Sequence, residues 1–246
     1  MTGLGATART TARPVHVVVV PGMGLTAYVD PTVDSLRARG HRASVLDLPG
    51  FGSPRPLACR PTVREVAATA AAWLRAEAHE SPGQRLVLLG HSTGAVSALL
   101  AGLELQDEGV LAGVVLAGPV ATPSQRSLPR IIAAAPRAYR RDSPRELVEL
   151  GQLARGGPDA VRLLRSALAE RPEELVTSLR LPLVLTAGRA DAFAPSWWLS
   201  QLASAALASP SVGVARLPGS HNNLFTHPDQ VAAVAEGLGA TPTIVR

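Results

Sequence analysis

Residues 86–94 constrain the fold of this chain more than any other segment. The segment begins with four consecutive aliphatic residues, a pattern typical of a strand buried on both faces. It ends in a G-x-S-x-G pentapeptide centred on Ser92, and a mostly apolar helical pattern follows at 95–103. A buried strand that turns sharply into a helix predicts one unit of a parallel sheet covered by helices.

A serine in such a turn suits nucleophilic catalysis, because the turn lifts its hydroxyl clear of the sheet. The hydroxyl is a poor nucleophile unless a base lies beside it and hydrogen-bond donors stabilise the developing oxyanion. The backbone N–H of Thr93 is the expected first donor. The pentapeptide alone is a weak signal in a chain with 22 glycines, so the flanking strand and helix carry the prediction.

Composition sets broad limits on the fold. A chain of 246 residues with 46% hydrophobic content can bury a large core, as one α/β domain or two smaller ones. The single cysteine, Cys59, forms no internal disulfide, offers no metal-site spacing and fits a reducing compartment. Neither a secretory signal nor a bilayer-spanning run is visible. The sequence therefore predicts a cytoplasmic protein without a metal, a cofactor or a membrane partner.

The formal charge of +5 is weak support for an anionic partner. All 24 basic residues are arginine, a bias typical of GC-rich coding sequences, and acidic residues are interspersed among them. Only 3% of the residues are aromatic, which leaves little for base stacking. We therefore expect a small-molecule substrate rather than nucleic acid. The oligomeric state stays open.

Strand and helix patterns alternate along most of the chain, which is typical of a parallel sheet with helices on both faces. The strand patterns lie at 15–20, 44–48, 85–89, 110–117, 183–186 and 212–217. The helical patterns lie at 29–39, 62–79, after Ser92, after Pro195 and at 228–237. The predicted fold class is α/β, with a mostly parallel sheet of about six strands.

The alternation breaks between residues 118 and 181. Helical patterns lie near 126–138, 144–155, 158–169 and 172–180. Because both ends return to the alternating pattern, residues 121–181 are predicted to be a helical lid on a core of 1–120 and 182–246; an independent helical domain is the alternative. The residues predicted to line a substrate pocket, with ordinary packing as the alternative, are Leu128, Ile132, Tyr139, Trp197 and Trp198.

His221 and Asp191 are the candidates for the base and the acid. His221 follows the strand at 212–217 in a loop, and Asp191 follows the strand at 183–186. A carboxylate there would accept the Nδ1–H of His221 and leave Nε2 free for the serine proton. The alternatives are an exposed loop histidine and a helix-capping aspartate. His91 precedes Ser92, and we expect its side chain to be directed away from the hydroxyl.

The loop after the first strand, residues 21–24, is expected to supply the second oxyanion donor, the N–H of Met23. Glycines flank Met23 on both sides and let the backbone turn toward the site, although a plain glycine-rich turn is the alternative. Nucleotide binding is a poor interpretation of this loop. The chain contains neither a lysine nor G-x-G-x-x-G spacing.

Taken together, these motifs resemble the α/β-hydrolase fold family, in its small, lidded form. The matching segments are 22–24, 47–53, 90–94, Gly188 with Asp191 and Pro195, and 219–221. The chain order Ser, Asp, His also matches that family. The resemblance implies a serine hydrolase and argues against the branches that use an aspartate nucleophile. Two departures are Pro21, where the family often has histidine, and an opening antiparallel strand pair that is shortened or absent.

The leading functional hypothesis is a serine hydrolase that cleaves an ester, lactone or thioester of a small apolar molecule through an acyl-enzyme. Carbon–carbon bond hydrolysis, acyl transfer, and cyclisation or elimination in secondary metabolism are alternatives on the same scaffold. A ligand-binding role without catalysis is a third hypothesis, and the presence of candidates for all three triad residues argues against it.

Overall fold

The computed structural model describes residues 14–53, 55–140 and 150–239, and its centre is a six-stranded sheet. The strand order is β2-β1-β3-β4-β5-β6, and every pairing among them is parallel. The strands are β1 (Val15–Val20), β2 (Arg42–Val45), β3 (Arg85–His91), β4 (Leu111–Ala117), β5 (Leu183–Gly188) and β6 (Val212–Leu217). The predicted α/β class and parallel sheet are confirmed.

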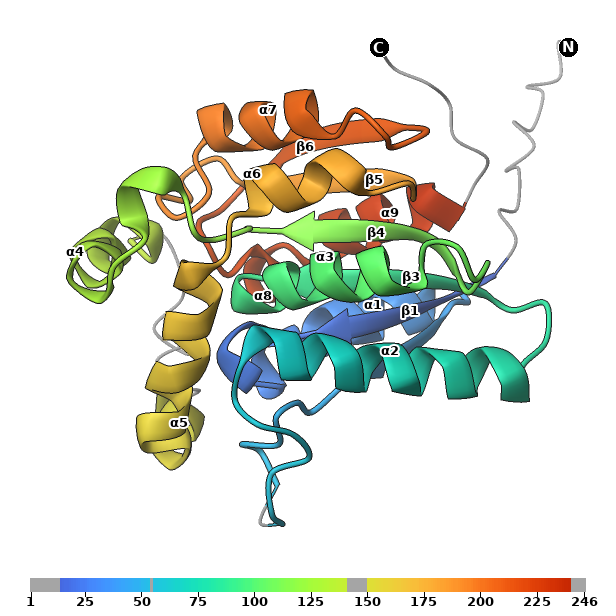
Figure 1. Cartoon of the computed structure of the whole chain (residues 1–246), viewed down its shortest axis with the longest axis horizontal. Coiled ribbons are helices and arrows are strands. Elements are labelled where there is room, and N and C mark those ends of the chain that lie inside the picture. Colours follow the sequence, from blue (N-terminus) through green and yellow to red (C-terminus); the bar gives the residue numbers. More distant parts are fainter. Residues whose placement is uncertain (1–13, 54, 141–149, 240–246) are drawn as a thin grey trace, which may run out of the picture.

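Helices cover both faces of this sheet (Figure 1). One face carries α2 (Val63–Glu80), α3 (Thr93–Leu105), α6 (Pro172–Leu175) and α7 (Ser196–Ala205). The other face carries α1 (Asp30–Ala38), α8 (Asn223–Thr226) and α9 (Pro228–Gly239). Two hydrophobic cores result, because alternate residues of a strand point to opposite faces. In β1, Val15, Val17 and Val19 pack into one core, and Val18 and Val20 pack into the other.

Local sequence explains several boundaries. The side chain of Thr62 accepts the Glu65 N–H at 3.3 Å and caps the start of α2. The β2 strand lies at Arg42–Val45 rather than 44–48, because it is an edge strand that pairs with β1 alone and turns away before Pro49. The sequence does not predict the short α8 helix, since four residues are too few to show a helical period.

Between β4 and β5 the chain forms the helices predicted for this region. They include α4 (Leu128–Ala138) and α5 (Leu150–Ala169), and α5 joins two predicted helices across a kink at Gly157. The predicted helix at 172–180 is α6 followed by a 3₁₀ turn. Residues 144–149 of the predicted helices lie outside the described residues.

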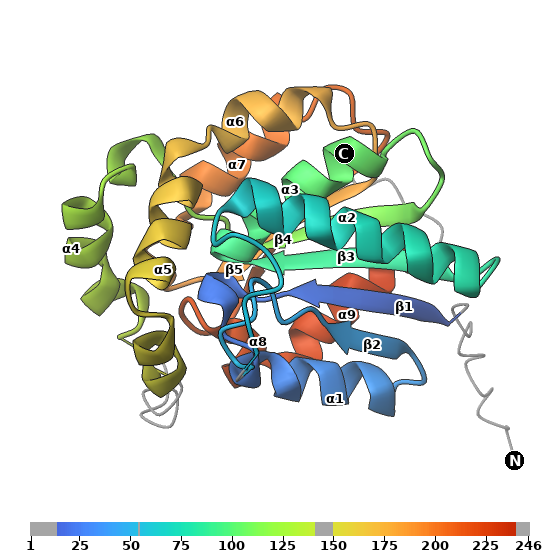
Figure 2. The same ribbon diagram turned by 60° about the horizontal axis from the view of Figure 1, so that its bottom comes forward.

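The α4 and α5 helices lie beyond the end of the sheet toward which β1 and β4 point (Figure 2). Two contacts fasten the segment between β4 and β5 to this edge: the His221 N–H donates to the carbonyl of Ala138 at 2.9 Å, and the Gln125 side chain donates to the carbonyl of Ala192 at 2.9 Å. That this segment acts as a lid stays a prediction. Within the described residues, no helix combines the length and hydrophobicity needed to cross a bilayer.

Candidate active site

Ser92 occupies a strained turn between β3 and α3. Its φ and ψ are 56° and −119°, a conformation that costs free energy in a non-glycine residue. The glycines on either side are sterically required. A Cβ at Gly90 would lie 2.6 Å from the Cβ of Ala98, and one at Gly94 would lie 2.7 Å from the carbonyl oxygen of Pro21. The strand-to-helix turn predicted from the pentapeptide is therefore present.

Asp191 and His221 form a buried pair at the ends of β5 and β6. The Asp191 Oδ2 lies 2.9 Å from the His221 Nδ1, and both residues are almost fully buried. The other carboxylate oxygen accepts the N–H groups of Phe193 (2.8 Å) and Ala194 (3.1 Å). Burial opposes ionisation of this carboxyl, but His221 and these hydrogen bonds outweigh burial and lower the pKa of Asp191.

The ionised state of Asp191 determines which nitrogen of His221 carries the proton. A carboxylate only accepts hydrogen bonds, so the His221 Nδ1 must be the donor. In the neutral ring Nε2 is then a bare acceptor. This Nε2 is buried and makes no hydrogen bond to any of the residues that the structure describes. The pair can therefore accept a proton at Nε2.

Aromatic rings enclose His221. The rings of Phe193 and Tyr139 meet it edge-on, with centroids 4.8 Å and 5.5 Å away. The His91 ring lies 4.8 Å away at a more parallel angle. Because these rings exclude water, interactions between charges at this base are stronger than in solvent.

The loop at residues 21–24, which is predicted to supply an oxyanion donor, contacts the Ser92 turn. A Cβ added to Gly22 would lie 2.7 Å from the Cβ of Ser92, so only glycine fits there. Met23 has a left-handed conformation with φ of 54°. Its N–H, the predicted second donor, hydrogen-bonds to the Thr93 Oγ1 at 2.7 Å. The two predicted oxyanion residues therefore lie together, with the Met23 amide already partnered.

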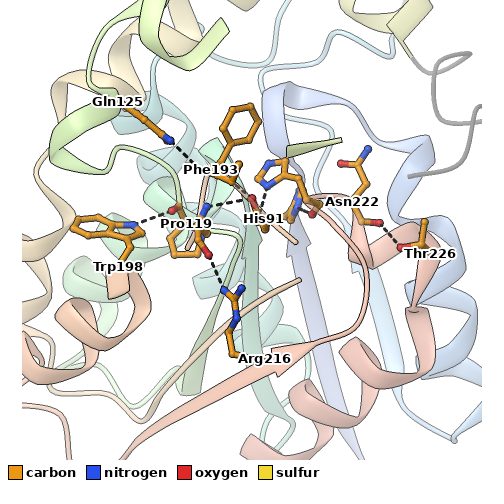
Figure 3. Close-up of polar contacts among 12 residues, drawn as sticks. His91, Pro119, Gln125, Phe193, Trp198, Arg216, Asn222 and Thr226 are labelled. Carbon is orange, nitrogen blue, oxygen red and sulfur yellow. Dashed lines mark hydrogen bonds and ion pairs between the residues drawn. The ribbon is translucent and has the colours of Figure 1, made fainter. Parts of the chain in front are cut away.

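The five predicted pocket residues occupy different surroundings. Tyr139 contacts His221, whereas Ile132 is 64% exposed and Trp197 is 50% exposed. Trp198 is fully buried, and its indole donates to the carbonyl of Pro119 at 3.0 Å (Figure 3). Leu128 lines a surface cavity of about 330 Å³ between α4 and α5, with Arg126, Ser127, Arg165, Leu168 and Ala169.

Sequence reasoning missed several residues that hold the site. Arg216 donates to the carbonyl of Ala194 at 2.7 Å and fastens the Asp191 loop (Figure 3). The Tyr28 hydroxyl hydrogen-bonds to the His91 ring, and the His91 ring hydrogen-bonds to the carbonyl oxygen of His221. These contacts join residues far apart in the chain, and no local pattern signals them. Among the described residues, no group of three potential ligand side chains gathers to hold a metal ion.

Comparison with known sequences gives one family and two curated relatives. The model of the alpha/beta hydrolase family matches residues 17–234. The "probable esterase PIR7A" of Oryza sativa subsp. indica is 40% identical over 103 residues, which are 42% of this chain and 38% of that protein. The protein of the same name from subsp. japonica gives the same values. The matched segment thus spans about two fifths of the relatives' length.

Solved structures share this fold. The type II thioesterase YbtT from the yersiniabactin NRPS/PKS pathway has a TM-score of 0.66 and 21% identity, over 94% of each chain. A lipase-esterase related protein from Clostridium acetobutylicum has a TM-score of 0.69 and 14% identity, over 92% of this chain and 94% of that one. RedJ, a thioesterase of the prodiginine pathway in Streptomyces coelicolor, has a TM-score of 0.64 and 18% identity, over 96% and 91%.

Proposed function

The chain belongs to the alpha/beta hydrolase family, and from this premise we propose that it is a serine hydrolase of esters, lactones or thioesters of small, largely apolar molecules. The observation that carries the proposal is the buried Asp191–His221 pair, whose Nε2 is left without a partner among the described residues. The strained Ser92 turn lies at the same edge of the sheet. The esterase and thioesterase names of the relatives and similar structures support the same reaction class.

In the first half-reaction, the Ser92 oxygen bonds to the substrate carbonyl carbon while its proton passes to the His221 Nε2. Asp191 stays ionised and stabilises the imidazolium through the 2.9 Å hydrogen bond. The tetrahedral intermediate then collapses, and His221 returns the proton to the departing alcohol or thiol. Ser92 is left as an acyl ester.

In the second half-reaction, water attacks the acyl ester and gives its proton to the His221 Nε2. Collapse of this second intermediate releases the acid and restores the serine hydroxyl. The N–H groups of Thr93 and Met23 hold the oxyanion in both halves. Because Met23 donates to the Thr93 hydroxyl in the structure, the oxyanion must replace that hydroxyl as acceptor.

The aromatic rings around His221 favour an apolar acyl group. The helices between β4 and β5 would act as a lid, because Ser92 is only 7% exposed and the Ala138–Tyr139 end of α4 covers the base. We propose that this end of α4 moves aside when substrate enters. We assign the core to residues 1–120 and 182–246 and the lid to 121–181.

A fluorophosphonate probe tests the proposal, because it phosphonylates only an activated serine. We expect a single adduct on the wild-type chain, located at Ser92 by peptide mass spectrometry, and none on Ser92→Ala. Ser97→Ala, which removes a buried hydroxyl elsewhere on α3, is the matched control and should label normally. A wild-type chain that stays unlabelled would exclude the serine mechanism. Incorporation of ¹⁸O from labelled water into the released acid separates hydrolysis from acyl transfer.

A further inference from the structure

A series of buried hydrogen bonds, which the proton-transfer steps do not use, joins the segment after β1, the last residue of β3 and the loop after β6. The Gly22 N–H donates to the Tyr28 Oη at 2.7 Å, and this oxygen lies 2.6 Å from the His91 Nδ1. On the other side of the ring, the His91 Nε2 lies 2.9 Å from the carbonyl oxygen of His221 (Figure 3). Tyr28 is 5% exposed and His91 is 1% exposed.

The donor and the acceptor of each of these three hydrogen bonds can be assigned. A carbonyl oxygen only accepts, so the His91 Nε2 carries a hydrogen. Burial first, and then the nearby His221, lower the pKa of His91 to about 3, so the ring is neutral and Nδ1 is a bare acceptor. The phenol of Tyr28 must donate to it. Burial raises the pKa of Tyr28 and keeps this phenol protonated.

The residues joined by these hydrogen bonds are next to, or part of, the groups that the reaction needs. Gly22 precedes Met23, whose amide is a proposed oxyanion donor, and His91 precedes Ser92. The series ends at the backbone of His221 itself. We propose that Tyr28 and His91 are positioning residues. They hold the loop at residues 21–24 and the His221 loop in fixed positions relative to the Ser92 turn. This inference rests on the proposed function, since it gives the two residues a role relative to that triad.

The His91 ring is held by its bonds to Tyr28 and to the His221 carbonyl, and it also lies against the His221 ring. A series of hydrogen bonds that fixes the end of β3 to the segments after β1 and β6 acts on geometry rather than on proton transfer. Small displacements of reacting groups reduce rates steeply, so such a series should affect turnover more than substrate binding.

The substitution Tyr28→Phe tests the proposal by removing one oxygen atom. It leaves the Gly22 N–H and the His91 Nδ1 without their partner. With a small aryl ester as substrate, we expect kcat to fall by about 10- to 100-fold while KM changes little. His16→Asn is the matched control: His16 is an equally buried histidine that bonds to Ser44, near the opposite end of β1. It should lower the melting temperature and leave kcat unchanged.

If Tyr28→Phe behaves like this control, with a lower melting temperature and an unchanged kcat, the positioning role is wrong. A second measurement is independent of activity and of the folding of any variant. In ¹⁵N-histidine NMR of the wild-type chain, His91 should be the neutral Nε2–H tautomer from about pH 5 to about pH 8. An Nδ1–H tautomer, or titration near the ordinary histidine pKa, would overturn the assigned direction.

The two experiments separate failure of this proposal from failure of the proposed function. If the wild-type protein is labelled at Ser92 but Tyr28→Phe has the wild-type kcat, the hydrolase mechanism is retained and the positioning role is wrong. A wild-type chain that is neither labelled nor active loses both roles. The NMR result still decides whether the series of hydrogen bonds exists as assigned.

Discussion

The proposed acid–base side of the site, at Asp191 and His221, and the proposed oxyanion side, at Met23 and Thr93, differ in how ready they are for reaction. On the acid–base side, Asp191 accepts three hydrogen bonds and orients His221, whose Nε2 has no partner among the described residues. On the oxyanion side, the Met23 N–H is already donated to the Thr93 hydroxyl. The first side is organised before substrate arrives, whereas the second must exchange a hydrogen bond. We therefore expect Asp191→Asn on the first side and Thr93→Val on the second to change the rate in opposite directions.

The largest effect should follow from damage to the acid–base side by Asp191→Asn. The amide can donate to the His221 Nδ1 and so stabilise the tautomer that leaves Nε2 protonated and unable to accept the serine proton. By analogy with triads of this kind, we expect kcat to fall about 10⁴-fold. The measurement is steady-state hydrolysis of an aryl ester. Asp107→Asn, a surface variant that removes only an ion pair to Arg180, is the control. A loss of less than about tenfold would mean that this side is not organised by Asp191.

The pairing of Asp191 with His221 could be predicted from sequence, because parallel strands end at one edge of a sheet. Ser92, Asp191 and His221 each follow such a strand. In each case an apolar run or a turn motif in the local sequence indicates where the strand ends. The predictions for the sheet were confirmed for the same reason. Periodicity and turn residues are local signals, so most strand and helix positions needed no knowledge of the tertiary structure.

The oxyanion side could not be predicted to the same depth. The bond between Met23 and Thr93 joins residues 70 positions apart, and that between Tyr28 and His91 spans 63 positions. Such contacts depend on side-chain rotamers in the folded state, which leave no periodic pattern in the sequence. Trp198 shows the same limit. The sequence predicts that it lines a pocket, but its indole is buried and hydrogen-bonds to the carbonyl of Pro119. Packing in the folded state decides between these two positions.

Thr93→Val tests the oxyanion side directly. Valine keeps the shape of threonine but removes the acceptor, so the Met23 N–H is unpaired until an oxyanion arrives. We expect kcat/KM to rise about fivefold and the free energy of unfolding to fall by about 1 kcal/mol, the net worth of one hydrogen bond. Thr69→Val, which removes a hydroxyl bonded within α2, should cost stability without a rate gain. A lower kcat/KM in Thr93→Val would show that this hydroxyl itself stabilises the oxyanion.

The pH dependence of stability tests His91, which connects the two sides. Its pKa of about 3 lies below the ordinary value of 6.5, so between these values the unfolded chain binds a proton that the folded protein does not. Stability must therefore fall as pH decreases. His91 alone should remove about 2 kcal/mol of unfolding free energy between pH 7 and pH 5. Urea unfolding should show this loss in the wild type and in the exposed-histidine variant His79→Gln, but not in His91→Gln. An unchanged pH dependence in His91→Gln would mean that His91 is not a buried neutral ring.

The smallest effect should come from the aromatic cover over the acid–base side. The Tyr139 ring meets His221 edge-on while remaining 42% exposed, so it lies between the base and solvent. In Tyr139→Ala, access should improve for bulky substrates, with KM for a long-chain ester falling about threefold and kcat for an acetate ester staying within about twofold. Arg130→Ala, which truncates an exposed side chain on the same helix, should leave both constants unchanged. If kcat falls equally for short and long esters, Tyr139 orients His221 instead of covering it. The readiness of the acid–base side would then depend on α4 as well as on Asp191.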